Sequence, residues 1–144
     1  MPLHLLKLCV GATSVADLED WIAERLDEKR RLGLAVEQVH TTRMVPTRVD
    51  ELLDGGSLYW VIKGEVACRQ KLTDVRPFVD ADGIRRCHLV LDPAVLKVAP
   101  RPSRPFQGWR YLKAQEAPAD LREGTGGEEL PEEMRRELRA LGLM

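Results

Sequence analysis

The middle of the chain is a series of short β-forming runs separated by tight turns, and this series limits the fold more than any other feature. Residues 57–62 are aromatic and β-branched, and Lys63-Gly64 predicts a tight turn into a second strand over residues 65–72. Residues 80–83 (Asp-Ala-Asp-Gly) predict another turn, followed by a strand over residues 84–91. Successive strands joined in this way pair antiparallel, which excludes a doubly wound parallel sheet.

Further strands are predicted outside this central series, over residues 3–10, 36–44 and 106–112. Residues 95–98 resume the strand pattern, and the prolines that follow them predict an extended linker. If the Lys63-Gly64 turn has two residues, Trp60 faces Ala67 on the neighbouring strand.

Helices are predicted near both ends of the chain. Thr13 or Ser14 offers an N-cap, apolar residues then recur at helical spacing from Val15 to Leu26, and basic residues precede Gly33. A short helix over residues 47–53 stops at a Gly-Gly pair, and a last helix is predicted over residues 131–143.

These elements predict an α+β protein. We expect a small curled antiparallel sheet or barrel, with an N-terminal covering helix and a C-terminal tail helix. The length of 144 residues fits one domain. We assign the barrel-like domain to residues 1–113 and a polar acidic tail with a short C-terminal helix to residues 114–144.

Composition and cysteine spacing indicate the cellular compartment in which we expect the protein. Three cysteines without a C-x-x-C spacing predict buried free thiols in a reducing compartment. No apolar run approaches the roughly 20 residues that span a bilayer, and the first ten residues lack the pattern of a signal peptide, so we expect a cytoplasmic protein without membrane contact.

Basic and aromatic residues interleave in the middle of the chain, where residues 36–113 carry thirteen basic and nine acidic residues, a net charge of +4. Guanidinium groups bind phosphate and aromatic rings stack on bases, so this pattern suggests an RNA or nucleotide site. The alternative is that the aromatic residues face the core while the arginines alternate outward. The predicted ligand-binding residues are Arg43, Arg48, Tyr59, Trp60, Lys63, Arg69, Arg104, Trp109 and Arg110.

Catalytic signals are weak in this sequence. The three histidines share no metal-ligand spacing, and neither a nucleophile elbow nor a P-loop is present, so we predict no metal, cofactor or catalytic residue. A small hydrolase or transferase remains an alternative if two of His40, Cys87 and His88 meet in one cleft. A protein-interaction adaptor that docks through Met134, Leu138 and Leu141 is another.

Five strings carry a resemblance to a known family: LLKLCVG at residues 5–11, TRMVP at 42–46, DELLDGGSLYWVIKG at 50–64, GIRRCHLVLDP at 83–93 and PFQGWRYL at 105–112. Together they resemble the uncharacterised bacterial family called domain of unknown function 1489, which is found mainly in α-proteobacteria. The resemblance covers nearly the whole chain and implies no activity.

A second, fainter likeness is to the pseudouridine-synthase-and-archaeosine-transglycosylase (PUA) superfamily, including its ASC-1-homology branch. There a short helix leads through a glycine turn into a strand, and a small barrel follows. Residues 49–63 and the closing strand at 106–112 are similar. The likeness implies a PUA-like barrel with an RNA or modified-nucleotide cleft. The lining that it implies is Arg43, Arg48, Tyr59, Lys63 and Arg69.

Overall fold

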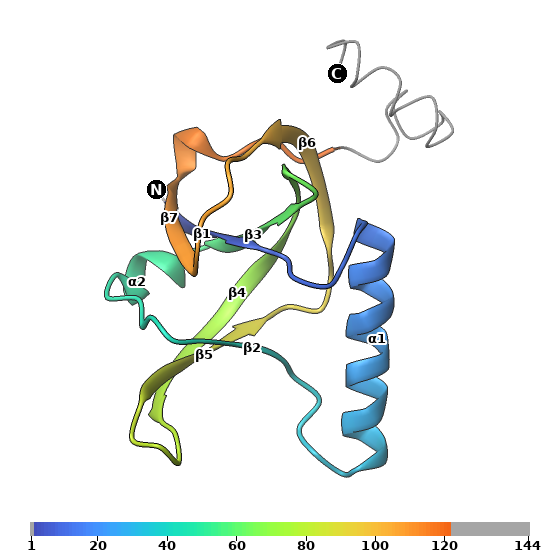
Figure 1. The fold of residues 1–144 in the computed structure, drawn as a ribbon, viewed down its shortest axis with the longest axis vertical. Helices are drawn as coiled ribbons and strands as arrows, with labels where there is room; N and C mark the ends of the chain where they lie inside the picture. Colours follow the sequence, from blue (N-terminus) through green and yellow to red (C-terminus); the bar gives the residue numbers. More distant parts are fainter. Residues whose placement is uncertain (1, 122–144) are drawn as a thin grey trace.

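The computed structural model describes residues 2–121 of the chain (Figure 1). Its elements, in chain order, are β1 (Leu3–Leu8), α1 (Val15–Arg31), β2 (Gln38–Thr42), α2 (Val49–Leu52), β3 (Ser57–Ile62), β4 (Glu65–Val79), β5 (Arg85–Leu91), β6 (Leu96–Pro102), β7 (Trp109–Lys113) and the 3-10 turn η1 (Ala114–Glu116). This is the predicted α+β class. The predicted C-terminal helix over residues 131–143 lies outside the described residues.

The seven strands form one mixed sheet that is not closed. The order is β2-β5-β4-β3-β1-β7, and β6 pairs with β4 beside this path. The prediction of an all-antiparallel sheet was wrong at one pair, because β1 and β3 run parallel with Leu5 opposite Leu58. The long connection through α1, β2 and α2 lets β3 run beside β1 in the same direction, as a parallel pair requires. A closed barrel is likewise not formed, because β2 and β7 end the order unpaired with each other.

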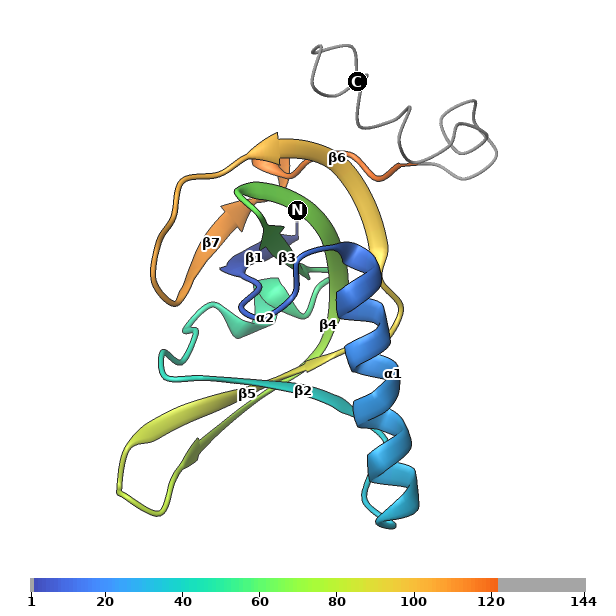
Figure 2. The same ribbon diagram turned by 45° about the vertical axis from the view of Figure 1, so that its right-hand side comes forward.

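The long strand β4 organises the sheet. Its first half pairs with β3 along one edge and with β6 along the other, and its second half pairs with β5. Figure 2 shows β6 arching alongside β4, while β5 and β2 continue below it. Residues 100–102, predicted as a linker, therefore belong to a strand. The fixed φ of proline suits extended backbone, and proline is tolerated where a strand has a free edge.

The predicted turn at Lys63-Gly64 is present, and both residues have positive φ, 50° and 79°. Such values match the two-residue hairpin turn. The strand register then shifts between Trp60 and Val61, so Trp60 lies opposite Cys68 and not opposite Ala67. The extra residue of a β-bulge accounts for this difference.

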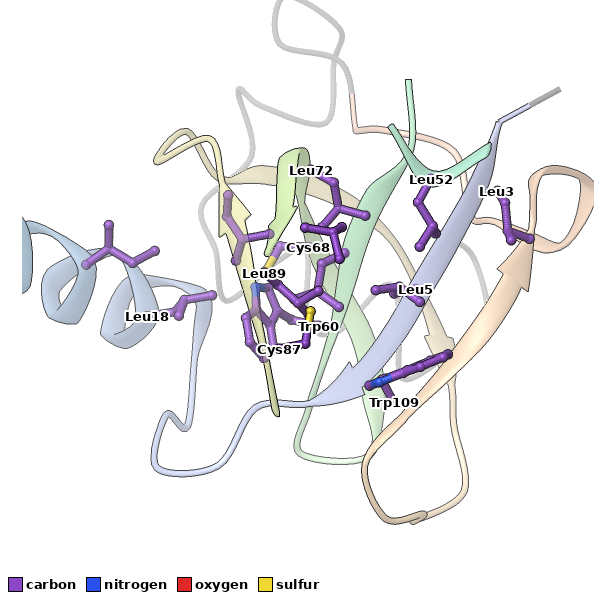
Figure 3. Close-up of a cluster of buried hydrophobic side chains, with 14 of the residues drawn as sticks. Leu3, Leu5, Leu18, Leu52, Trp60, Cys68, Leu72, Cys87, Leu89 and Trp109 are labelled. Carbon is purple, nitrogen blue, oxygen red and sulfur yellow. The ribbon is translucent and has the colours of Figure 1, made fainter. Parts of the chain in front are cut away.

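Both faces of β3 are covered, and all six of its residues are buried. Alternate side chains enter two apolar clusters. One cluster contains Leu58 and Trp60 and extends to the buried face of α1. The other contains Tyr59 and Val61 and is closed by Val98 of β6. In Figure 3 Trp60 lies among other side chains of the first cluster, close to those from β4 and β5.

Helix α1 begins as its sequence predicts. The backbone N–H of Asp17 donates to the Ser14 hydroxyl at 3.0 Å, while the Asp17 carboxylate accepts from Thr13. Leu18, Ile22 and Leu26 form its buried face. No helix within residues 2–121 is long and apolar enough to cross a membrane.

Gly56 holds the junction between α2 and β3. A Cβ atom at this position would collide with the carbonyl oxygens of Leu3 and Leu52. The backbone itself needs this space, because the Gly56 N–H donates to the Leu52 carbonyl at 3.0 Å. Only glycine therefore allows β3 to start beside β1.

We predict that Gly56→Ala lowers the free energy of unfolding by about 3 kcal/mol or more, because backbone cannot move aside as a flexible side chain can. Urea unfolding followed by tryptophan fluorescence measures the change. The matched control is Gly83→Asn, at a turn with φ +78° and no atom within 4 Å of an added Cβ. Since Asn tolerates this conformation, its cost should stay below about 1 kcal/mol. Equal losses in the two variants would contradict this account of Gly56.

Candidate functional site

The residues predicted to bind ligand do not form one surface. Arg43, Arg48, Arg104 and Arg110 are exposed. Arg110 is on β7, Arg48 lies over Tyr111 of β7, and Arg104 follows Ser103, whose N–H donates to the Gly64 carbonyl at the β3–β4 turn. Tyr59, Trp60 and Trp109 are buried, with exposed fractions of 4%, 3% and 7%. Lys63 is exposed at the β3–β4 turn, and Arg69 is half-buried on β4.

Two loops that lie far apart in the sequence meet at β7. The indole N–H of Trp109 donates to the Met44 carbonyl oxygen at 2.9 Å. The Tyr111 hydroxyl accepts from the backbone N–H of Thr47 at 3.0 Å and of Arg48 at 3.3 Å. Residues 43–48 are thereby fixed against the strand that follows residues 103–108, and Figure 1 shows β7 next to α2.

Guanidinium groups lie over aromatic rings on both faces of β7. The Arg48 guanidinium carbon is 5.6 Å from the centre of the Tyr111 ring, and that of Arg110 is 5.7 Å from the centre of the Phe106 ring. Arg110 and Tyr111 point to opposite faces because side chains alternate along a strand. The two pairs therefore flank the same strand edge, one on each side.

The phenol of Tyr111 is held as a hydrogen-bond acceptor. Partial burial on its own raises the pKa of Tyr111, but hydrogen bonds with Thr47 and Arg48 and the Arg48 charge outweigh it, so the pKa is lowered. Arg48 also pairs with Glu51 at 2.6 Å. Both contacts keep the Arg48 guanidinium in place beside the ring.

Tyr59 and Trp60 are parts of the core and cannot stack on a ligand from their buried positions. The Tyr59 ring meets the His4 ring edge-on at 5.0 Å, and the Trp60 N–H donates to Gln70 at 2.9 Å. Both residues thus follow the alternative in which strand aromatics face inward. Their strand is buried on both faces, so alternation brings neither ring to the surface.

Arg69 lies in a polar network that sequence reasoning did not predict. Its guanidinium donates to both carboxylate oxygens of Asp120 at 2.7 Å and to the Ser57 hydroxyl at 2.8 Å. The Ser57 backbone N–H donates to Nδ1 of His4 at 3.0 Å. Asp120 comes from the segment after η1, where it pairs with Val98 of β6. No local pattern signals a contact between residues 51 positions apart, so the sequence offered no sign of it.

We predict that Asp120→Asn lowers the free energy of unfolding by about 1 kcal/mol, because a half-buried guanidinium loses its charged partner. Hydrogen bonding to Arg69 holds the pKa of Asp120 below its usual range, so this contribution is present at neutral pH and is lost as pH falls through that lowered pKa. Urea unfolding at pH 7 measures it.

The matched control is Asp27→Asn, which removes an exposed pair with Arg31 at 3.5 Å. Exposed pairs of this kind contribute about 0.3–0.5 kcal/mol. A loss for Asp120→Asn no larger than for Asp27→Asn would show that the network does not hold the segment after η1.

The cysteine and histidine side chains are not arranged as a nucleophile and its base. Cys87 is fully buried, and burial raises the pKa of its thiol. His88 points to the other face of β5, where it contacts the Thr41 hydroxyl at 3.0 Å and stacks on Phe78. Within residues 2–121 no thiol is hydrogen-bonded to an imidazole ring, and no three potential metal ligands of the His, Cys, Asp and Glu types cluster.

His40 lies against the core. Its ring stands edge-on to the Trp60 ring, with centres 5.1 Å apart. Burial, followed by the charges of Lys7 and Arg25, lowers the pKa of His40 from 6.5 to about 4. The ring is therefore neutral at pH 7. Because its folded-state pKa is depressed, the neutral ring stabilises the fold fully above about pH 6.5, and this stabilisation is lost as pH falls toward 4.

We predict that unfolding free energy falls by about 2 kcal/mol more between pH 7.5 and 5 in the native chain than in a His40→Phe variant. Phenylalanine keeps an aromatic ring against Trp60 and cannot be protonated. Urea unfolding at several pH values measures both chains. Parallel pH profiles would contradict the depressed pKa.

A family model described as "Protein of unknown function (DUF1489)" matches residues 5–144, so the chain belongs to that family. This confirms the family resemblance of the sequence. No curated protein and no solved structure matches the chain. The likeness to the PUA superfamily stays a prediction from the sequence.

Proposed function

We propose that this protein binds single-stranded RNA at the edge of its sheet formed by β7. The contact surface, the β7 edge patch, consists of Arg43, Arg48, Arg104, Phe106, Arg110 and Tyr111. The observation that carries the proposal is the attachment of residues 44–48 to β7: the Trp109 indole N–H donates to Met44, and the Tyr111 hydroxyl accepts from Thr47 and Arg48. These hydrogen bonds hold the loop that carries Arg43 and Arg48 against the strand that carries Arg110 and follows Arg104.

The patch combines the two groups that single-stranded nucleic acids require. Guanidinium groups of Arg43 and Arg104 are exposed and suited to phosphate oxygens. Phe106 and Tyr111 are half-buried, so part of each ring faces solvent, where a base can stack. These two rings replace Tyr59 and Trp60 in the stacking role that the sequence suggested.

Single-stranded RNA fits the patch better than a duplex. The cations lie on both faces of an edge strand, because Arg110 points away from the face that holds Tyr111 and Arg48. A flexible strand can wrap around such an edge and bring bases to both rings. A rigid duplex presents its phosphates along a surface and keeps its bases stacked inside.

A salt titration tests the proposal. We predict that a fluorescein-labelled mixed-sequence RNA of 20 nucleotides binds, and that the logarithm of the association constant falls with the logarithm of salt with a slope of about −3, as expected for four phosphate contacts on a single strand. The double variant Arg43→Gln/Arg110→Gln should bind at least tenfold more weakly and reduce the slope by about 1.4.

The matched control is Arg30→Gln/Arg85→Gln, which removes two exposed arginines from the end of α1 and the start of β5. It has the same net charge as the test variant. Equal weakening by both variants would mean that net charge and not the patch binds RNA. Absence of binding at 50 mM salt would overturn the proposal.

A further inference from the structure

A second group of cations and an imidazole lies at the seam between α1, β1 and β2. Its starting point is Nε2 of His40, a buried atom without a hydrogen-bond partner among residues 2–121. Buried polar nitrogens are nearly always hydrogen-bonded, because an unpaired one costs about 1–3 kcal/mol. We therefore expect this nitrogen to form a hydrogen bond with a group outside residues 2–121.

The strand register places Lys7 next to Trp60, whose indole this imidazole contacts. Lys7 lies opposite Trp60 on β3 and opposite Trp109 on β7. Its position in β1 puts it on the same face as Leu5, which is the face that carries Trp60. The His40 ring packs edge-on against that same Trp60 ring. Lys7 and His40 thus border one indole from two different strands.

The electrostatic setting of the seam is cationic. Burial lowers the pKa of Lys7, and the charges of Lys7 and Arg25 both contribute to the lowered pKa of His40. Arg25 is exposed on α1, where its guanidinium lies 4.2 Å from the centre of the Trp21 ring. Besides burial, the Cys9 thiol acts on Lys7.

Two cations and a neutral imidazole suit an anion and repel a metal cation. One oxygen of an oxyanion accepts from the Lys7 ammonium, and another accepts from His40 in the tautomer that carries the Nε2 proton. The bound charge offsets the repulsion among the cations and supplies the missing hydrogen bond. Both side chains are only partly buried, so the group lies close beneath the surface beside the exposed Arg25.

We propose that Lys7 and His40 form a binding site for a small oxyanion, a phosphate or carboxylate group, with Arg25 at its entrance. This site does not depend on RNA binding at the β7 edge patch. Trp60 lies behind the His40 ring as part of the core and does not itself stack on the ligand.

Nitrogen NMR of the full chain tests the site. Inorganic phosphate is titrated to 20 mM at pH 7 and constant ionic strength, maintained with sodium chloride, and sodium acetate is titrated in a separate sample. We expect a saturable shift of the His40 Nε2 resonance and of the Trp60 indole N–H with at least one of the two anions. The ring nitrogens of His88 on the outer face of β5 serve as the internal control and should not move.

Variants separate a site from a general salt effect. Lys7→Met keeps the length and apolar stem of the side chain and should lower the affinity for the anion at least tenfold. Lys7→Gln provides a second test if the first variant is unstable. Saturation with phosphate but not acetate identifies a phosphate group, and the reverse identifies a carboxylate. The site is rejected if neither anion produces a saturable shift, or if the folded Lys7 variants bind as the native chain does. RNA affinity of these variants should stay within twofold of the native value, so failure here is distinct from failure at the patch.

Discussion

The structure depends on the burial of β3 on both faces. This strand runs parallel to β1 and antiparallel to β4, and its side chains alternate between two apolar clusters. Leu58 and Trp60 enter the cluster that meets α1, while Tyr59 and Val61 enter the cluster closed by β6. β3 can start in this position only because residue 56 is glycine. A side chain there would collide with the backbone. The side chains of β3 are therefore unavailable to a ligand.

The edge at β7 shows how core contacts arrange a surface. Trp109 is buried, yet its indole N–H holds Met44, and Tyr111 holds Thr47. These bonds set the position of Arg43 and Arg48 relative to the strand. Aromatic residues that the sequence pattern places beside arginines thus have two roles: Trp109 anchors the loop from within, and Tyr111 offers a half-buried ring next to a guanidinium. The basic side chains surround the edge without sharing one face.

Sequence reasoning found most elements because their signals are local. The hairpin at Lys63-Gly64 follows from its residues, and so does the helix that Ser14 caps. The bulge that puts Trp60 opposite Cys68, the parallel pairing of β1 with β3 and the Arg69–Asp120 pair depend on distant contacts. The sequence also could not tell which aromatic residues reach the surface. In the structure Tyr59 and Trp60 are buried, while Phe106 and Tyr111 are half-buried. Arg43 and Arg110 were predicted as ligand-binding residues, while the unpartnered nitrogen of His40 could be found only from the packed structure.

The most direct test of the central claim is a map of backbone amide shifts as single-stranded RNA is added to the isotope-labelled protein. Binding at the β7 edge patch predicts that the largest changes occur at residues 43–48 and 104–111, on both faces of β7. The amide resonances of α1 and of the β4–β5 turn should not shift. Shifts centred on α1 or on the β3–β4 turn at Lys63, with residues 104–111 unmoved, would contradict the account.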